Sequence, residues 1–220
     1  MSNVKNTAKR ARRSQLAMES GFRLFSERGI EQVTMPDIAQ DSGVARPSLY
    51  RYFSNKTELV IAIGTWKWNE YIQARNAMVT PEEAEKKTAA EALRMYTDSF
   101  LDLYRNHKDI LCFNYYFNGF IQQAGATDEQ KNPYLEIVQK LECAFHAEYE
   151  KGRRDGTIRM DIPEQVMFSS MFHIMLSAVT RYAVGLVYTS QDPEQELNLL
   201  ADALMKEFTQ NDRDDAHAIA

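Results

Sequence analysis

Six side chains between residues 46 and 56 have the chemistry of a surface that recognises duplex DNA. They are Arg46, Pro47, Ser48, Tyr50, Arg51 and Lys56. A guanidinium group can donate two hydrogen bonds to the edge of a guanine, and a proline ring can pack against a thymine methyl group. Hydroxyl and ammonium groups bind backbone phosphates, which position a protein on DNA without reading its sequence. The set therefore indicates both base contacts and phosphate contacts.

The order of these residues predicts how the two kinds of contact are divided. Arg46, Pro47 and Ser48 would begin a helix and approach the base edges, with Arg46 as the donor to a guanine. The residues expected to bind mainly phosphates are Thr34, Tyr50, Arg51 and Lys56. Of these, Arg51 could also reach a base.

The segment from Thr34 to Leu59 predicts the helices that would position these side chains. Thr34 suits the N-cap of a short helix, and Asp37 three residues later completes a capping-box pattern. Gly43 suits a turn in the left-handed backbone conformation. Leu49 would then lie on the inner face of a second helix. The pattern is that of a helix-turn-helix, although spacing alone also fits an ordinary helical hairpin.

A family resemblance favours the DNA-binding interpretation. The run LFSERGIEQVTMPDIAQDSGVARPSLYRYFSNKTEL resembles the N-terminal domain of TetR-family transcriptional regulators, and the likeness covers about Ala17 to Leu59. It includes the T-x-x-DIA opening, the SGV turn and the LYRYF-x-NK-x-EL ending. One departure is Ala45, where the family often has a Ser or Thr that caps the recognition helix. The resemblance implies a regulator, more often a repressor, with a palindromic operator and a small-molecule effector.

The charge distribution agrees with a DNA-binding head. The chain has 220 residues and a formal net charge of −5. Residues 1–55 nevertheless hold nine Lys/Arg against five Asp/Glu, whereas the remainder holds 17 against 26. A basic head on an acidic body orients the head toward phosphates.

The helical patterns predict an all-α fold with two domains. We expect a helix-turn-helix DNA-binding domain over residues 1–55, an effector-binding and dimerisation domain over 56–208, and a disordered tail over 209–220. Residues 1–8 would form an arm ahead of the first helix. The expected later helices span 56–79, 82–105, 108–122, 132–154, 163–188 and 193–208, as judged from periodicity and Gly/Pro punctuation.

Aromatic and methionine side chains are concentrated in the expected body. The candidate ligand-binding residues are Trp68, Tyr71, Phe100, Phe113, Tyr116, Phe117, Phe120, Met171 and Met175. They could line a pocket for a small apolar or aromatic effector, with Asn114 among the possible polar anchors. For each of these residues taken singly, a place in a well-filled core is the better explanation. The resemblance implies that the body contains an effector cavity.

The last two predicted helices are candidates for a homodimer contact. The segment from Val166 to Tyr188 is apolar on more than one face and needs partners on more than one side. In the family that the chain resembles, such helices pair across a two-fold axis. A two-fold dimer would match a palindromic operator with half-sites on the order of 34–36 Å apart.

Other function classes find little support in the sequence. No catalytic signature, nucleotide-binding loop or metal-ligand spacing is present, so we predict no enzyme, no cofactor and no metal. Cys112 and Cys143 are isolated, and the N-terminus lacks an apolar run, which predicts a cytoplasmic protein without a membrane segment. The alternative function is a helical small-molecule-binding or protein-interaction module without DNA regulation.

Overall fold

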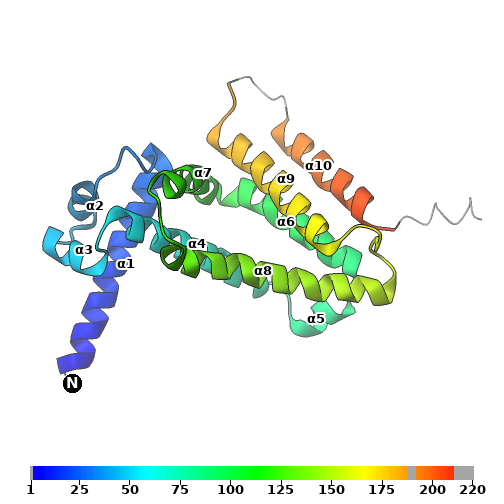
Figure 1. Ribbon diagram of the computed structural model, residues 1–220, viewed down its shortest axis with the longest axis horizontal. Coiled ribbons are helices and arrows are strands. Elements are labelled where there is room, and N and C mark those ends of the chain that lie inside the picture. Colours follow the sequence, from blue (N-terminus) through cyan, green and yellow to red (C-terminus); the bar gives the residue numbers. More distant parts are fainter. Residues whose placement is uncertain (1, 188–191, 211–220) are drawn as a thin grey trace, which may run out of the picture. The chain divides into compact units, whose positions relative to one another are not determined.

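The computed structural model describes residues 2–187 and 192–210 (Figure 1). Its helices are α1 (Ser2–Arg28), α2 (Met35–Ser42), α3 (Arg46–Tyr52), α4 (Lys56–Asn76), α5 (Pro81–Lys86), α6 (Ala89–Asn106), α7 (Lys108–Gln123), α8 (Asp128–Asp155), α9 (Glu164–Val184) and α10 (Pro193–Phe208). Within the described residues the only β pairing is an isolated bridge between Ile158 and Thr209. The predicted all-α fold class is therefore confirmed.

The helices fall into two compact units, which we describe one at a time. Unit 1 comprises residues 1–72 and 109–138, and unit 2 comprises residues 73–108 and 139–220. Packing thus groups residues 56–72 and 109–138, which were expected in the body, with the N-terminal helices. The predicted functional boundary between residues 55 and 56 stays a prediction, because a unit of packing is not a test of independent function.

In unit 1, helices α1, α2 and α3 pack around a small apolar core. Phe25, Ile38 and Leu49, one from each helix, have no exposed surface. A Cβ added at Gly21 would lie 2.8 Å from Ile63 Cδ1, so the absence of a side chain there lets α1 and α4 approach closely. These contacts fix the orientation of α3 relative to α1.

The first helix is longer than the sequence predicted. Residues 1–8 were expected to form an arm, but α1 begins at Ser2. The sequence between residues 2 and 16 contains no Gly or Pro to stop the helix, so the backbone continues in the same conformation toward the N-terminus.

Aromatic side chains from α1, α7 and α8 form a second part of the unit 1 core. Phe113 on α7 is 1% exposed, and its ring centroid lies 5.7 Å from that of Phe22 on α1 and 5.7 Å from that of Phe117. The Phe117 ring in turn lies 4.6 Å from the ring of Tyr134 on α8. Ring pairs at these separations contribute roughly 0.5–1.5 kcal/mol each beyond their buried area.

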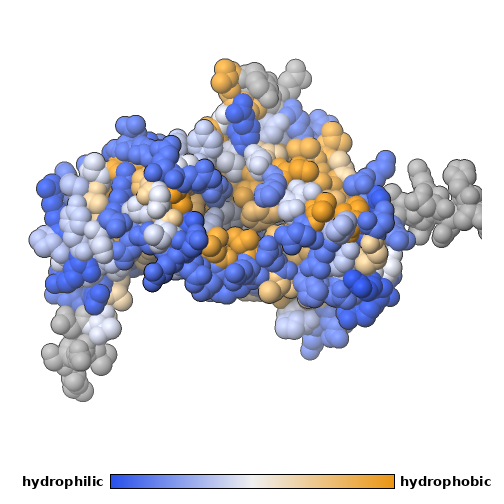
Figure 2. Space-filling model, viewed as in Figure 1, coloured by the Kyte–Doolittle hydropathy of each residue, from blue (hydrophilic) through white to orange (hydrophobic). Residues whose placement is uncertain are grey.

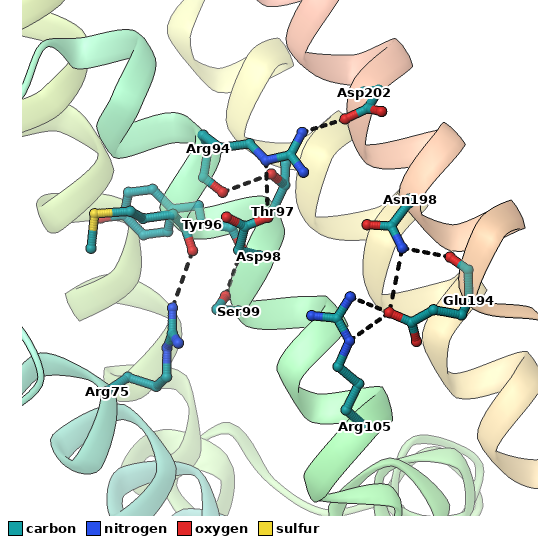
Figure 3. A network of polar contacts seen from close by, with 11 residues as sticks. Arg75, Arg94, Tyr96, Thr97, Asp98, Ser99, Arg105, Glu194, Asn198 and Asp202 are labelled. Atoms are coloured by element: carbon teal, nitrogen blue, oxygen red, sulfur yellow. Dashed lines mark hydrogen bonds and ion pairs between the residues drawn. The ribbon is translucent and has the colours of Figure 1, made fainter.

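In unit 2, helices α6, α9 and α10 pack side by side (Figure 1). Their contact is filled by buried aliphatic and methionine side chains, among them Leu93, Met171, Met175, Val179 and Leu197. Polar contacts surround this core and join α6 to α10 (Figure 3). Arg94 bonds to Asp98 and Asp202, and Arg105 bonds to Glu194.

Two helices replace the single one expected over residues 82–105. Thr80 and Thr88 each cap a helix, and each completes a capping box with a glutamate three residues later, Glu83 and Glu91. The second box starts α6 after a break at Lys87, whose ψ of 149° is extended. The repeated T-x-x-E pattern carried this signal in the sequence.

The limits of the later helices also differ from expectation. Helix α8 begins at Asp128 and includes Pro133, which the sequence analysis had treated as a boundary. Pro133 lies in the second turn, where it has no N–H to donate to the Glu129 carbonyl, so α8 continues through it with one hydrogen bond fewer. Helix α9 ends at Val184, before Gly185 with φ 108°.

The expected tail over residues 209–220 lies mostly outside the described residues. Its first two residues are ordered against unit 2. Arg159 N donates to Phe208 O at 2.9 Å, and Gln210 N donates to Thr157 O at 3.1 Å. Thr209 and Gln210 therefore follow α10 in contact with the 157–159 segment, and the disorder expected of the tail stays a prediction.

Two features of other protein classes are absent from the described residues. No helix there is long and apolar enough to cross a membrane. The same residues contain no group of three or more His, Cys, Asp or Glu side chains placed to hold a metal ion.

Candidate nucleic-acid interface

Helices α2 and α3 form the helix-turn-helix that the sequence predicted. Thr34 Oγ1 accepts a hydrogen bond from Asp37 N at 3.3 Å, and Asp37 Oδ2 accepts one from Thr34 N at 2.8 Å. Gly43 has φ 66° and ψ 13° and ends α2 in the left-handed conformation. Ala45 precedes α3 and offers no side-chain cap. The capping box, the glycine turn and the uncapped start of α3 are all confirmed.

One side of α3 is buried and the other faces solvent. Leu49 has no exposed surface and anchors the inner side. Arg46, Pro47 and Arg51 are exposed, and Tyr50 is 48% exposed. The exposed side therefore carries four of the side chains proposed to contact DNA.

Ser48 and Thr34 are less available for such contacts. Ser48 is only half-buried, but it lies away from the arc shared by Arg46 and Tyr50 on the helix. Thr34 Oγ1 donates to Asp37 Oδ2 at 2.6 Å, so a phosphate would compete with this carboxylate for the hydroxyl proton. The hydrogen bonds from Thr34 also lower the pKa of Asp37. The roles assigned to both residues stay predictions.

Lys56 starts α4 and is held against an aromatic ring. Its Nζ lies 5.3 Å from the ring centroid of Phe120 on α7, within the range of a cation–π contact. Burial lowers the pKa of Lys56, and the charge of Glu31 opposes that shift. Asn55 Oδ1 accepts from Glu58 N at 2.9 Å, so Asn55 caps this helix.

The basic residues of α3 make no close contact with a carboxylate among the described residues, although the charge of Arg46 helps to lower the pKa of Asp37. In the part of the chain that the structure describes, neither Arg46 nor Arg51 forms an ion pair. Arg51 lies over the ring of Tyr52, with its Cζ 5.7 Å from the centroid. Unneutralised guanidinium groups on an exposed helix face are the feature that phosphate and base-edge recognition requires.

The candidate ligand-binding residues are divided between the two units. Trp68, Tyr71, Phe113, Tyr116, Phe117 and Phe120 belong to unit 1, and Phe100, Met171 and Met175 belong to unit 2. Several are core residues, as the alternative of a well-filled core predicts. Phe113 contacts Phe22 of α1. Phe117 packs near Gly64 of α4, where an added Cβ would lie 3.1 Å from the Phe117 ring. None of these ligand assignments is tested by the fold.

A polar group lies among the unit 1 aromatics. Tyr134 Oη donates to Asn114 Oδ1 at 3.4 Å, and burial raises the pKa of Tyr134 to about 12. The indole N–H of Trp68 makes no well-formed hydrogen bond within the described residues, yet it is close enough to Tyr134 to oppose that shift. Tyr134 lies within the helix expected over residues 132–154 but was not among the candidate ligand-binding residues.

The fold and this site define an all-helical protein with an N-terminal helix-turn-helix. Residues 17–63 match the family described as "Bacterial regulatory proteins, tetR family". The N-terminal helices are thus similar to the tetR family of bacterial regulatory proteins over this segment.

Two curated relatives match different lengths of the chain. The HTH-type transcriptional regulator TtgR of Pseudomonas putida is 44% identical over 46 residues, which is 21% of this chain and 22% of that protein. The match therefore spans about a fifth of that relative's length. The HTH-type transcriptional repressor KstR2 of Rhodococcus jostii is 24% identical over 199 residues, covering 90% of this chain and 93% of the relative.

A solved structure extends the likeness of the fold beyond the N-terminal helices. It is that of a transcriptional regulator from Saccharomonospora viridis in complex with choline, with a TM-score of 0.71. The identity is 15%, and the alignment covers 91% of this chain and 100% of that one. At this identity the likeness concerns the fold alone.

Proposed function

We propose that this protein is a sequence-specific DNA-binding transcriptional regulator, and specifically a repressor. The observation that carries the proposal is the exposed face of α3, where Arg46 and Arg51 lie unpaired beside Tyr50 on a helix held in place by Leu49. A helix of this kind fits the major groove, where base edges can be distinguished. Such a regulator would act in the cytoplasm, where bacterial DNA lies.

We also propose that the protein binds DNA as a homodimer through α9 and α10. Figure 2 places apolar side chains on the surface over these helices. Val166, Ile174 and Leu199 are 51%, 43% and 69% exposed, which is unusual for large apolar residues on one pair of helices. A second copy of the chain would cover them and would present two α3 helices to a palindromic operator.

The proposed effector is a small apolar or aromatic molecule bound in the C-terminal part of the chain. A fold relative was crystallised with choline, which supports a ligand-binding role for this architecture. The chain of rings from Phe22 on α1 through Phe113 and Phe117 to Tyr134 on α8 offers a route by which packing changes could reach the N-terminal helices. A ligand would shift DNA affinity only through unequal affinity for two conformers.

The first test is a DNA-binding titration with a fluorescent duplex pool at several salt concentrations. We expect binding that weakens steeply with salt, because phosphate contacts release condensed counterions. The alternative, a ligand-binding module without DNA regulation, predicts no salt-sensitive binding to any duplex. It also predicts that a small molecule still raises the melting temperature.

A further inference from the structure

The first turns of α1 extend away from the core of unit 1. Residues 7–13 are all exposed, and the first buried side chain of the helix is Ala17. At about 1.5 Å per residue, residues 7–16 extend the helix by roughly 15 Å beyond its buried part. Figure 1 shows this dark blue segment continuing past α2 and α3, which belong to the same unit.

The extension carries four cations and no acid. They are Lys9, Arg10, Arg12 and Arg13. Helical geometry places residues three and four apart on one face, so Arg10 and Arg13 continue the line that runs through Ala17 and Ser20. Ser20 Oγ donates to Asp41 Oδ2 on α2 at 2.5 Å. The two arginines therefore lie along the side of α1 that, further on, packs against the helix-turn-helix.

Arg10 also connects this extension directly to α3. Its Cζ lies 5.9 Å from the centroid of the Tyr52 ring, and the Cζ of Arg51 lies 5.7 Å from the same centroid. Two guanidinium groups thus gather around one ring at the end of the helix proposed to read DNA. Like charges gathered in this way are stabilised by a bound anion.

The residues that the structure describes do not supply that anion. Among the described residues, no carboxylate forms an ion pair with any of the four cations. Arg23, on the same helix, provides the contrast, because it pairs with Glu27 at 3.2 Å and with Asp41 at 2.5 Å. The cations of the extension are therefore available to a partner, whereas Arg23 is already used in the fold.

The dimensions of the extension select the part of DNA that it can contact. An α-helix with side chains is about 10–12 Å across, whereas the minor groove is about 6 Å wide. The helix cannot enter that groove, but a line of cations can follow the phosphates at its edge. Such contacts would be independent of base sequence.

We propose that the first turns of α1 form a second DNA-binding element, in which Lys9, Arg10, Arg12 and Arg13 bind backbone phosphates beside the groove entered by α3. This inference rests on the proposed DNA binding and adds a site to it. The element supplies affinity and not sequence preference. Arg10 has the additional role of joining the phosphate contacts to Arg51 through Tyr52.

The test is the salt dependence of DNA binding by the full-length Arg12→Gln/Arg13→Gln variant. Glutamine keeps the helix propensity close to that of arginine, and both positions are exposed, so the melting temperature should not change. Each lost phosphate contact should lower the slope of log affinity against log salt by about 0.9, so the double variant should lose about 0.9–1.8. The decrease in the salt slope should be equal for selected and for random duplexes.

Two matched variants control for charge and for side-chain length. Lys140→Gln/Arg154→Gln removes two exposed cations from unit 2 and should keep the native slope. Arg12→Lys/Arg13→Lys keeps both charges and should also keep it. An unchanged slope for Arg12→Gln/Arg13→Gln, or a loss on one sequence only, would overturn the phosphate-binding element alone. Native protein that binds no duplex would overturn the proposed function itself.

Discussion

Three arginines of unit 2 differ in their contacts from the arginines of α3 and of the first turns of α1. In unit 2, Arg94 reaches Asp202 on another helix, Arg105 reaches Glu194, and Arg159 binds Asp161 and Glu207 at 2.6 and 2.8 Å. In unit 1, the arginines of α3 and of the first turns of α1 form no ion pair within the described residues. These three arginines stabilise contacts within unit 2, whereas arginine at these unit 1 positions is left for a partner.

This difference is more informative than net charge. A formal charge of −5 alone argues against a polyanionic partner. The pairing pattern explains how the same chain can bind one, because the acidic residues of unit 2 are partly neutralised by its own arginines while the N-terminal cations are not. Exposed ion pairs of this kind contribute at most about 1 kcal/mol each to stability. Their main consequence is that they determine which charged side chains remain without a partner.

The largest expected effect concerns the aromatic core that holds α1 in place. Phe113→Ala should lower the free energy of unfolding by about 3–5 kcal/mol, because a fully buried ring is replaced by a cavity. Tyr115→Ala, two residues away and 55% exposed, should change it by less than about 0.5 kcal/mol. Urea unfolding of both variants measures the difference. Equal costs would show that the ring chain does not support unit 1.

The next effect concerns an unpaired arginine of α3. Arg46→Ala should weaken binding to the preferred duplex by about 1–3 kcal/mol and relax the preference at one position of each half-site. Fluorescence anisotropy with single-substituted duplexes measures both quantities, with Arg154→Ala as the control for an exposed cation of unit 2. An unchanged base preference would remove Arg46 from sequence recognition.

Lys56 should give a smaller and sequence-independent effect. If its ammonium group binds a phosphate, Lys56→Ala should weaken binding to every duplex and reduce the salt slope by about 0.9. The Phe120 ring at 5.3 Å would hold the side chain in position for that contact. A native slope in the variant would instead assign Lys56 to packing against α7.

Removal of a paired charge in unit 2 should have a smaller effect on the free energy of unfolding than loss of a core ring. Asp202→Asn leaves Arg94 its second partner, Asp98, at 2.9 Å. The two carboxylates and the guanidinium are all substantially exposed, so the loss of unfolding free energy should be below about 1 kcal/mol. It should also shrink as salt is added. A loss of several kcal/mol would mean that this network, and not the buried core, holds α6 and α10 together.

The smallest effect should appear only in acid. Hydrogen bonds from Thr34 lower the folded-state pKa of Asp37, so the capping box stabilises fully above the unfolded-state pKa of about 3.9. That stability is lost as pH falls through the lower folded-state value. The difference in unfolding free energy between the native protein and Asp37→Asn should be constant from pH 5 to 7 and shrink below pH 4. A difference independent of pH would rule out this linkage.

Local signals explain which features could be predicted from sequence. The cap at Thr34, the turn at Gly43 and the inward position of Leu49 each depend on a few neighbouring residues. The same type of signal occurs at Thr80 and Thr88, and the break at Lys87 could have been predicted from it. Candidate DNA contacts followed from these local features, since exposure on a short helix depends mainly on periodicity.

Other features depend on packing between distant segments. No sequence pattern states that Phe113 meets Phe22, or that residues 109–138 join the same unit as α1. Pro133 was interpreted as a helix boundary because local preference disfavours it inside a helix, yet α8 begins five residues earlier and continues through it. The ligand candidates could not be assigned for the same reason, because a stripe of aromatic residues is compatible with both a core and a pocket.

The arginines of α3 and of the first turns of α1, which form no ion pair among the described residues, are proposed to bind DNA. The most direct measurement is selection of bound sequences from a random duplex pool, carried out in parallel with the native protein and with Arg46→Ala. We expect the native protein to enrich a two-fold symmetric sequence, and the variant to lose preference at one position of each half-site. A native protein that enriches no sequence, and whose retention of DNA does not change with salt, would contradict the claim.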